Sequence, residues 1–264
     1  MKTLPLHVLL FQVVLGANNE DVTIVEADRG PATSAVILLH GLGGNGNEFT
    51  SISNELRRKH AGLRSTRFVF PTAPIRPITM ASGQRMHGWY DIESLQSVYD
   101  QKDDVRGLKK SAKLLRRLAA QQLASGVKRV AVGGFSQGGA VSLFAMLLSP
   151  LPEEIVAVVI LSSYLPSRDK LSARLTDPAI HIGGASALPP VLICHGKDDD
   201  VVAHRHGKAS SKLLKAAGVD VRWRSYKGLA HSVSQAEMQD VATFLGKRLS
   251  RPPEHEGGGA SDEL

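Results

Sequence analysis

The sequence has only one cysteine, Cys194, among its 264 residues. A single cysteine excludes an intramolecular disulfide and any metal site built from several cysteines. Because Cys194 ends the apolar run that starts at Val191, we expect it to be a buried structural thiol. The length of the chain and its 42% hydrophobic content fit one α/β domain with a large core better than two small domains.

Aromatic residues are also scarce, at 5% of the chain, and this affects how the net charge of +7 is interpreted. The basic residues concentrate between Val105 and Leu123, where apolar residues recur at helical spacing: Leu108, Ala112, Leu115 and Ala119. No aromatic side chain lies among the charges. This favours the solvated face of an amphipathic helix over an anionic membrane or nucleic-acid surface, and we predict no nucleic-acid partner.

The first residues resemble a secretory signal peptide. Lys2 precedes an apolar segment from Leu4 to Leu15, which ends at the small residues Gly16 and Ala17. The segment is too short to span a bilayer. We therefore expect residues 1–17 to be a signal peptide, and the alternative is an ordinary disordered or strand-like N-terminus.

The last residues give a second indication of the cellular location. A Pro/Glu/Gly-rich stretch, residues 251–260, has the composition of a flexible tail and leads to a final Ser-Asp-Glu-Leu, residues 261–264. That ending resembles the K-D-E-L retrieval signals of the endoplasmic reticulum, with serine in place of the basic residue. Together the two ends predict a lumenal protein whose folded domain covers residues 18–250, with a cytoplasmic location as the alternative.

Between the ends, short apolar runs alternate with helical patterns, as in a doubly wound, mostly parallel sheet with helices on both faces. Strands are predicted at residues 35–39, 68–70, 129–133, 157–161, 191–194 and 221–226. Helices are predicted at residues 47–60, 105–123, 138–149, 208–217 and 234–249. The proline-rich residues 71–77 are interpreted as an irregular surface loop. Catalytic residues are expected at the carboxyl ends of the strands.

The glycine-rich segment from Gly133 to Gly139 has the pattern of a nucleophile elbow, with Ser136 at its centre. It follows a predicted strand and opens a predicted helix. Gly134 and Gly138 lie where the sharp turn would leave no room for a Cβ, and the helix dipole would stabilise an anion beside Ser136. Taken alone, the pattern also fits a glycine-rich turn with an incidental serine.

A serine hydroxyl becomes an effective nucleophile only when a base accepts its proton and a third group orients that base. In this fold an acidic residue and then a histidine follow the serine in the chain. Asp198, Asp199 and Asp200 follow one predicted strand, and His231 follows the next. We predict that His231 is the base and that one of the three aspartates orients it.

Acyl transfer also requires hydrogen-bond donors for the oxyanion of the tetrahedral intermediate. The backbone N–H of Gln137, directly after the nucleophile, is one candidate. The glycine-rich loop His40–Gly46 follows an early predicted strand and can offer the Leu42 N–H as the second. The loop is not a P-loop, because it lacks the lysine and Ser/Thr of that motif.

These motifs together resemble the family of acyl-protein thioesterases, lysophospholipases and small carboxylesterases. The segments that carry the resemblance are residues 40–43, 71–77, 88–92, 134–139, 195–200 and 231–232. The resemblance implies an α/β-hydrolase fold and identifies Asp199, four positions after His195, as the acid. It also implies that Leu42 and Gln137 supply the oxyanion-hole amides, and that Ile75 and Trp89 line a substrate groove for the acyl chain.

The expected activity is that of a serine esterase or thioesterase that works through an acyl-enzyme and needs no metal or organic cofactor. Expected substrates are acyl esters or thioesters of lipids, lysophospholipids or acylated proteins. Peripheral membrane contact and a homodimer are left open. A lumenal location would put S-acylated cytosolic proteins out of reach. The competing hypotheses are a peptidase or amidase on the same triad and a non-catalytic binding protein with a hydrolase fold.

Overall fold

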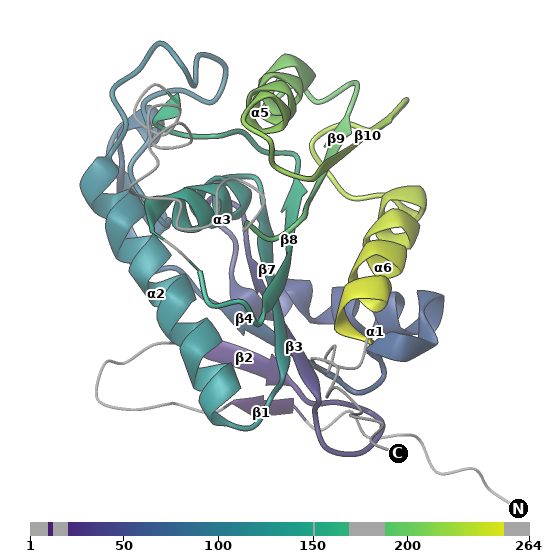
Figure 1. Cartoon of the computed structure of the whole chain (residues 1–264). Helices are drawn as coiled ribbons and strands as arrows, with labels where there is room; N and C mark the ends of the chain where they lie inside the picture. Colours follow the sequence, from purple (N-terminus) through teal and green to yellow (C-terminus); the bar gives the residue numbers. More distant parts are fainter. Residues whose placement is uncertain (1–9, 13–20, 150, 169–187, 251–264) are drawn as a thin grey trace, which may run out of the picture.

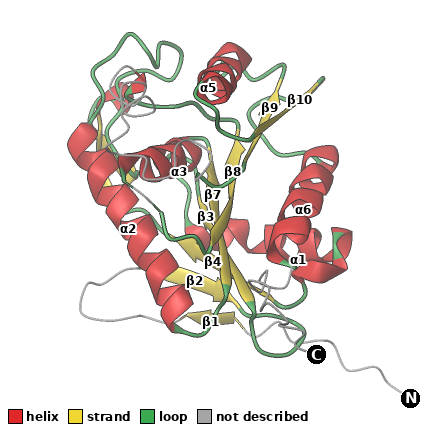
Figure 2. Ribbon diagram, viewed as in Figure 1, coloured by secondary structure: helices red, strands yellow, loops and turns green. Residues whose placement is uncertain are grey.

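The computed structural model describes residues 10–12, 21–149, 151–168 and 188–250. Their centre is an eight-stranded sheet in the order β1-β2-β4-β3-β7-β8-β9-β10 (Figures 1 and 2). Its strands are β1 (Leu10–Gln12), β2 (Val22–Val25), β3 (Ser34–Leu39), β4 (Thr66–Pro71), β7 (Arg129–Phe135), β8 (Ile155–Leu161), β9 (Val191–Gly196) and β10 (Val221–Tyr226). The six strands from β4 to β10 in this order pair in parallel, whereas β1 and β2 pair antiparallel at one edge.

Helices cover both faces of the sheet, which confirms the predicted α/β-hydrolase architecture. The α-helices are α1 (Thr50–Lys59), α2 (Val105–Ala124), α3 (Gln137–Leu148), α5 (His204–Ala216) and α6 (Gln235–Leu249). Short 3-10 helices lie at η1 (Gly46–Phe49), η2 (Ala61–Leu63) and η3 (Thr79–Ala81). Helices α1 and α6 pack together on one face of the sheet, and α2 and α3 pack together on the other (Figure 1).

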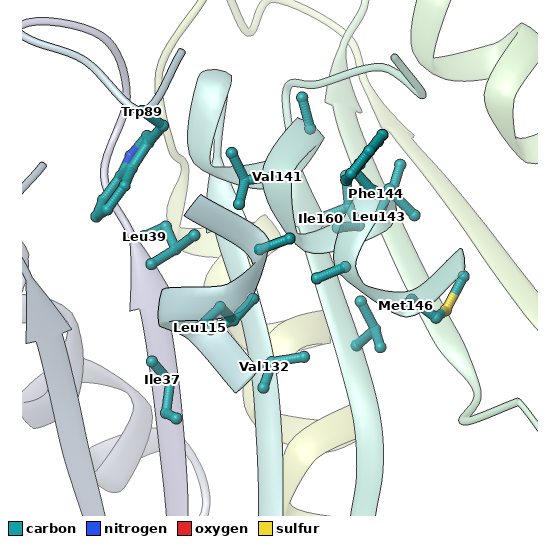
Figure 3. Close-up of a cluster of buried hydrophobic side chains, with 14 of the residues drawn as sticks. Ile37, Leu39, Trp89, Leu115, Val132, Val141, Leu143, Phe144, Met146 and Ile160 are labelled. Atoms are coloured by element: carbon teal, nitrogen blue, oxygen red, sulfur yellow. The ribbon is translucent and has the colours of Figure 1, made fainter. Parts of the chain in front are cut away.

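The alternation of side chains along β3 shows how the sheet divides the core in two. Ile37 and Leu39 join the cluster under α2 and α3, whereas Val36 and Leu38 join the cluster under α1 and α6. Figure 3 shows the first cluster, in which Leu115 of α2 lies among β3 and β7 residues. Strands buried on both faces need continuous apolar runs, and this explains why the central strands could be recognised in the sequence.

Two sequence expectations about the core are confirmed. The four apolar residues chosen from the α2 pattern are buried, and three of the basic residues between them, Lys109, Lys110 and Lys113, are exposed. Cys194 is fully buried in β9, where burial raises the pKa of its thiol. Its sulfur lies 3.4 Å from the Tyr226 hydroxyl, so it is a packed core residue.

The interpretation of residues 71–77 as an irregular loop is wrong. Residue 71 ends β4, and residues 75–77 lie in β5 (Ile75–Ile78), which pairs antiparallel with β6 (Gln84–His87) in a separate hairpin. The prediction failed at Pro77 because proline has no backbone N–H to donate to a neighbouring strand, and it therefore argues against a strand. It is tolerated in a strand that has a partner on one side only.

Most of the predicted signal peptide and the whole predicted tail lie outside the described residues. Within the predicted signal peptide, Leu10–Gln12 forms the edge strand β1, in which Phe11 pairs with Ile24 of β2. In the part of the chain that the structure describes, no helix has the length and apolar character needed to cross a membrane.

Candidate active site

Ser136 lies at the sharp turn between β7 and α3. Its backbone adopts φ 53° and ψ −120°, a strained conformation for a non-glycine residue. A Cβ on Gly138 would lie 2.3 Å from the Leu39 carbonyl oxygen, and one on Gly134 would lie 2.5 Å from the Gly138 carbonyl carbon. The two glycines therefore allow β3, β7 and α3 to meet closely enough to form the turn.

Hydrogen bonds on both sides hold the strained residue in place. The Ser136 N–H donates to the Leu161 carbonyl at 2.8 Å, and the Ser163 hydroxyl donates to the Ser136 carbonyl at 2.6 Å. Only 3% of Ser136 is exposed. The end of β8 and the residues that follow it thus fix the backbone of Ser136, which lies at the positive end of the α3 dipole.

The loop after β10 brings His231 to Ser136. His231 Nε2 lies 3.0 Å from the Ser136 Oγ, and the imidazole packs against the Phe135 ring with 4.7 Å between centroids. The loop is close to the end of β9, where a Cβ on Gly196 would lie 2.1 Å from the Leu229 carbonyl oxygen. Close backbone contact between two neighbouring loops therefore places the imidazole over the hydroxyl.

Of the three candidate aspartates, Asp199 is the one that contacts His231. Its Oδ2 lies 2.8 Å from His231 Nδ1. Asp198 instead accepts a hydrogen bond from the Gly228 N–H at 2.7 Å, and Asp200 is exposed. A carboxylate only accepts hydrogen bonds, so His231 Nδ1 carries the proton and Nε2 is free to accept the hydrogen of Ser136.

Asp199 has a buried side chain, and its environment keeps it ionised. Its Oδ1 accepts hydrogen bonds from the N–H groups of Val201 at 3.0 Å and Val202 at 2.8 Å. Burial by itself raises the pKa of the Asp199 carboxyl. Hydrogen bonds from His195, His231 and the Val202 N–H, together with the charge of His231, lower that pKa by a larger amount. The net pKa therefore lies well below the usual range. A carboxylate in this state can support positive charge on His231.

The glycine-rich loop after β3 lies directly beside Ser136. A Cβ on Gly41 would lie 3.4 Å from the Ser136 Cβ. His40 Nε2 accepts from the Ala73 N–H at 2.9 Å, so Nδ1 carries the hydrogen and donates to the Gly41 carbonyl at 2.6 Å. In a trans peptide the N–H points opposite to the C=O, so this bond directs the Leu42 N–H away from His40.

Gln137, the first residue of α3, combines a backbone and a side-chain role. Its N–H lies in the first helical turn, where no intrahelical acceptor exists. Its side chain accepts from the Trp89 N–H at 2.8 Å and donates to the Tyr90 carbonyl at 2.8 Å. The elbow is therefore linked to the segment between the hairpin and α2.

The two predicted groove residues differ in exposure. Ile75 is 54% exposed on β5, whereas Trp89 is buried and its indole N–H donates to the His40 carbonyl at 2.8 Å. Both line a cavity of about 670 Å³ between the hairpin and α2, together with Pro74, Leu114 and other residues. The described residues that line this cavity include none of the three triad residues.

Among the residues that the structure describes, no group of three or more His, Cys, Asp or Glu side chains is arranged to hold a metal ion. One histidine that the sequence analysis used only as a motif position does lie at the site. His195 Nε2 is 3.2 Å from the Asp199 Oδ2. The spacing of four residues between His195 and Asp199 was visible in the sequence, but it does not reveal which way a buried ring points.

The strained serine lies at hydrogen-bond distance from an imidazole, and that imidazole contacts a buried carboxylate. On a doubly wound sheet, this arrangement defines a serine hydrolase of the α/β-hydrolase fold.

The comparisons with known proteins give the family. Residues 20–249 match the family model described as Phospholipase/Carboxylesterase. Acyl-protein thioesterase 1 of Gibberella zeae is 37% identical over 228 residues, covering 84% of this chain and 93% of its own length. The enzyme of the same name from Emericella nidulans is 35% identical, with 86% and 93% covered.

Solved structures agree with the sequence relatives. The crystal structure of Zea mays acyl-protein thioesterase 2 superposes with a TM-score of 0.74 at 30% identity, covering 86% of this chain and 98% of the other. Arabidopsis thaliana SOBER1 gives a TM-score of 0.72 at 28% identity, with 82% and 99% covered. The chain belongs to the phospholipase/carboxylesterase family, and it is a serine hydrolase of the esterase and thioesterase group.

Proposed function

We propose that Ser136, His231 and Asp199 form the catalytic triad of this hydrolase. His231 accepts the Ser136 proton as the Oγ attacks an ester or thioester carbonyl, and Asp199 stabilises the resulting imidazolium. The protonated His231 then donates that proton to the leaving alcohol or thiol, and the acyl-enzyme remains. A water molecule, deprotonated by His231, then attacks the acyl carbonyl, the bond to the Ser136 Oγ breaks, and His231 returns the proton to that oxygen as the acid leaves. The observation that carries the proposal is the continuous contact from carboxylate to imidazole to hydroxyl, at 2.8 and 3.0 Å.

The backbone amides of Leu42 and Gln137 are the proposed oxyanion-hole donors. Two features support this role: Gly41 lies beside Ser136, and the Gln137 N–H is in the first turn of α3. The next amide of the loop, that of Gly43, is already engaged with the His87 carbonyl at 2.8 Å. Donors fixed before the reaction stabilise the developing negative charge without reorganisation.

The substrates we propose are acyl esters and thioesters of lipids or acylated proteins. The relatives that carry the name acyl-protein thioesterase support an acylated protein, and the family description supports a lipid or carboxylic ester. In this proposal Ile75 and Trp89 line the cavity that receives the acyl chain. No metal or organic cofactor takes part in the chemistry.

The first test is the substitution Ser136→Ala, with Ser53→Ala in α1 as the control for removing a buried hydroxyl. The variant should lose p-nitrophenyl ester hydrolysis and fluorophosphonate labelling, while its circular dichroism stays that of the wild type. The Ser53→Ala enzyme should keep both activities. Ester hydrolysis that survives in the Ser136→Ala variant would refute the triad.

Two further assays separate the competing hypotheses. A panel of p-nitrophenyl esters, acyl thioesters and matching p-nitroanilides should show turnover of esters and thioesters with much slower turnover of the amides. A peptidase would cleave the anilides at comparable rates. A non-catalytic binding protein would neither turn over any of them nor react with the fluorophosphonate.

The lumenal location, the homodimer and the peripheral membrane contact stay predictions. The domain boundaries near residues 17 and 250 are likewise untested. Extending the chain beyond Leu264 with a few residues should cause secretion if the final tetrapeptide acts as a retrieval signal, and an unchanged distribution would contradict it. Sedimentation analysis and vesicle flotation test the other two predictions.

A further inference from the structure

His195 is the next-to-last residue of β9, two strands away from the nucleophile. Its side chain is completely buried. The backbone at this point is paired on one side with β10, where Ser225 is its partner in the ladder. A polar ring in such a place needs partners, and those partners lie in the turn that carries Asp199.

The contacts of the ring fix its tautomer. Nε2 lies 2.7 Å from the Val202 carbonyl oxygen, which can only accept, so this nitrogen carries a hydrogen. The same nitrogen lies 3.2 Å from the Asp199 Oδ2. The N–H is directed at the Val202 carbonyl, and the carboxylate oxygen is the second negative atom within its reach.

Asp199 is consequently held from several sides. The turn from Asp199 to Val202 closes on itself, because the Val202 N–H binds the Asp199 Oδ1 while the Val202 carbonyl binds His195. The other carboxylate oxygen, Oδ2, lies between His195 and His231. One ring therefore secures both the shape of the turn and the oxygen that His231 uses.

Neighbouring residues pack closely around the ring. A Cβ on Gly207 of α5 would lie 2.2 Å from the His195 Nδ1, and the rings of His204 and Trp223 lie 5.8 and 6.3 Å away, centroid to centroid. Among the described residues, Nδ1 has no hydrogen-bond partner. A buried nitrogen without a hydrogen-bond partner lowers the stability of the fold, and the contacts of Nε2 offset that loss.

We infer that His195 is a positioning residue of the triad, which holds the Asp199 carboxylate in the orientation that His231 requires. The inference rests on the proposed function and adds a second histidine to it. His195 touches neither the substrate nor the reacting hydroxyl, so its effect passes through Asp199 to His231.

The test uses a pair of substitutions that differ only in hydrogen bonding. His195→Gln keeps a side-chain N–H that can reach the Val202 carbonyl, whereas His195→Met has about the same length and no donor. We expect kcat for ester hydrolysis to fall about 10- to 100-fold in the Met variant relative to the Gln variant, with KM within about twofold. His204→Phe, which keeps a ring beside His195, is the control and should retain the wild-type kcat.

A proton NMR measurement separates positioning from general stability. The downfield resonance of the His231 Nδ1–H should be kept in the His195→Gln variant and be lost or displaced in the His195→Met variant. If the Met variant does not fold, Gly207→Ala provides the same test, because its Cβ must displace the imidazole. It should slow fluorophosphonate labelling about 10-fold, whereas Ser211→Ala in the same helix should not.

Equal kcat values for folded Met and Gln variants, or an unchanged labelling rate in Gly207→Ala when that variant is used, would overturn the inference while the triad stands. A wild-type enzyme that neither hydrolyses esters nor reacts with the fluorophosphonate would instead refute the proposed function itself. The two failures are therefore distinguishable.

Discussion

The triad and the β5–β6 hairpin are built in opposite ways. The triad residues lie in turns at the carboxyl ends of parallel strands, and each is held by contacts from neighbouring strands or loops. The hairpin is a separate two-stranded unit that carries exposed apolar side chains, Ile75 at 54% and Met80, in the short helix that follows β5, at 42%. Both border the same loop after β3, because the Gly43 N–H binds the His87 carbonyl.

The difference teaches where change is tolerated. A displaced atom in the triad alters the reaction geometry, since a misplacement of about 1 Å can cost about 10²-fold in rate. An altered side chain at an exposed position of the hairpin, such as Ile75, changes only the apolar surface offered to a ligand. We therefore expect substitutions at the triad to lower kcat or stability, and substitutions on the hairpin to alter KM.

The largest expected effect comes from Asp199→Asn, which should lower kcat about 10⁴-fold because an amide favours the wrong tautomer of His231. The adjacent substitution Asp198→Asn is its control and should cost less than about 10-fold, because Asp198 binds only the Gly228 N–H. Steady-state ester hydrolysis measures both. Comparable losses in the two variants would contradict the choice of Asp199.

The next effect concerns stability. Gly138→Ala would place a Cβ 2.3 Å from the Leu39 carbonyl oxygen, so β3 and α3 must move apart. We expect a loss of about 3 kcal/mol or more in the free energy of unfolding, measured with urea. Gly126→Ala, at φ +95° in open space, is the comparison and should cost about 1 kcal/mol from backbone strain alone.

Glu237, in the first turn of α6 after the His231 loop, gives a pH-dependent test. Its carboxyl is buried, Oε2 accepts from the Ser234 N–H, and Oε1 has no partner among the described residues. Burial raises the pKa of Glu237 from 4.5 to about 7, against the hydrogen bond of Ser234 and with help from the charge of Asp240. A raised pKa means that its contribution to stability is complete below about pH 4.5 and is lost as the pH rises through about 7.

Glu237→Gln keeps the capping pattern of the helix but does not ionise. Between about pH 5 and about pH 8, the wild type should lose about 2 kcal/mol of unfolding free energy more than this variant. Urea titrations at the two pH values measure the difference. The exposed Glu93→Gln serves as the control, and a pH dependence in Glu237→Gln equal to that of the wild type would exclude Glu237 as its source.

The smallest effect should come from the hairpin. Ile75→Ala should raise KM for long-chain p-nitrophenyl esters about 3- to 5-fold and leave kcat unchanged, because burying the lost side chain against an acyl chain contributes about 1 kcal/mol. Met80→Ala, which removes another exposed apolar side chain outside the lining of the same cavity, should change neither constant. A fall in kcat for Ile75→Ala would remove the contrast between the hairpin and the triad.

Most of the central sheet could be predicted because its strands are buried on both faces. β10 was predicted with its observed bounds, and β3 and β9 within one or two residues. The hairpin was missed because its strands are short, exposed and interrupted by Pro77, so they lack the pattern that burial imposes. β2, with only four residues, was likewise not assigned.

The chemistry of the site was easier to foresee than its supports. Chain order and glycine spacing pointed to Ser136 and His231, and the family resemblance chose Asp199 among three neighbouring aspartates. The geometry then placed Asp199, and neither neighbour, at hydrogen-bond distance from His231. The contacts of His195 could not be foreseen, because they depend on the closure of a turn and on the missing side chain of Gly207 in the helix that follows that turn.

Gln137, the residue next to the nucleophile, connects two distant parts of the chain through its amide side chain. That amide is hydrogen-bonded to the Trp89 N–H and to the Tyr90 carbonyl, and the Ser111 hydroxyl of α2 donates to the Trp89 carbonyl. These hydrogen bonds connect the segment after the hairpin, the basic helix α2 and the nucleophile elbow. A sequence change that reshapes the surface for the acyl chain must therefore preserve the hydrogen bonds of Gln137, because without them the nucleophile would no longer be aligned with that surface.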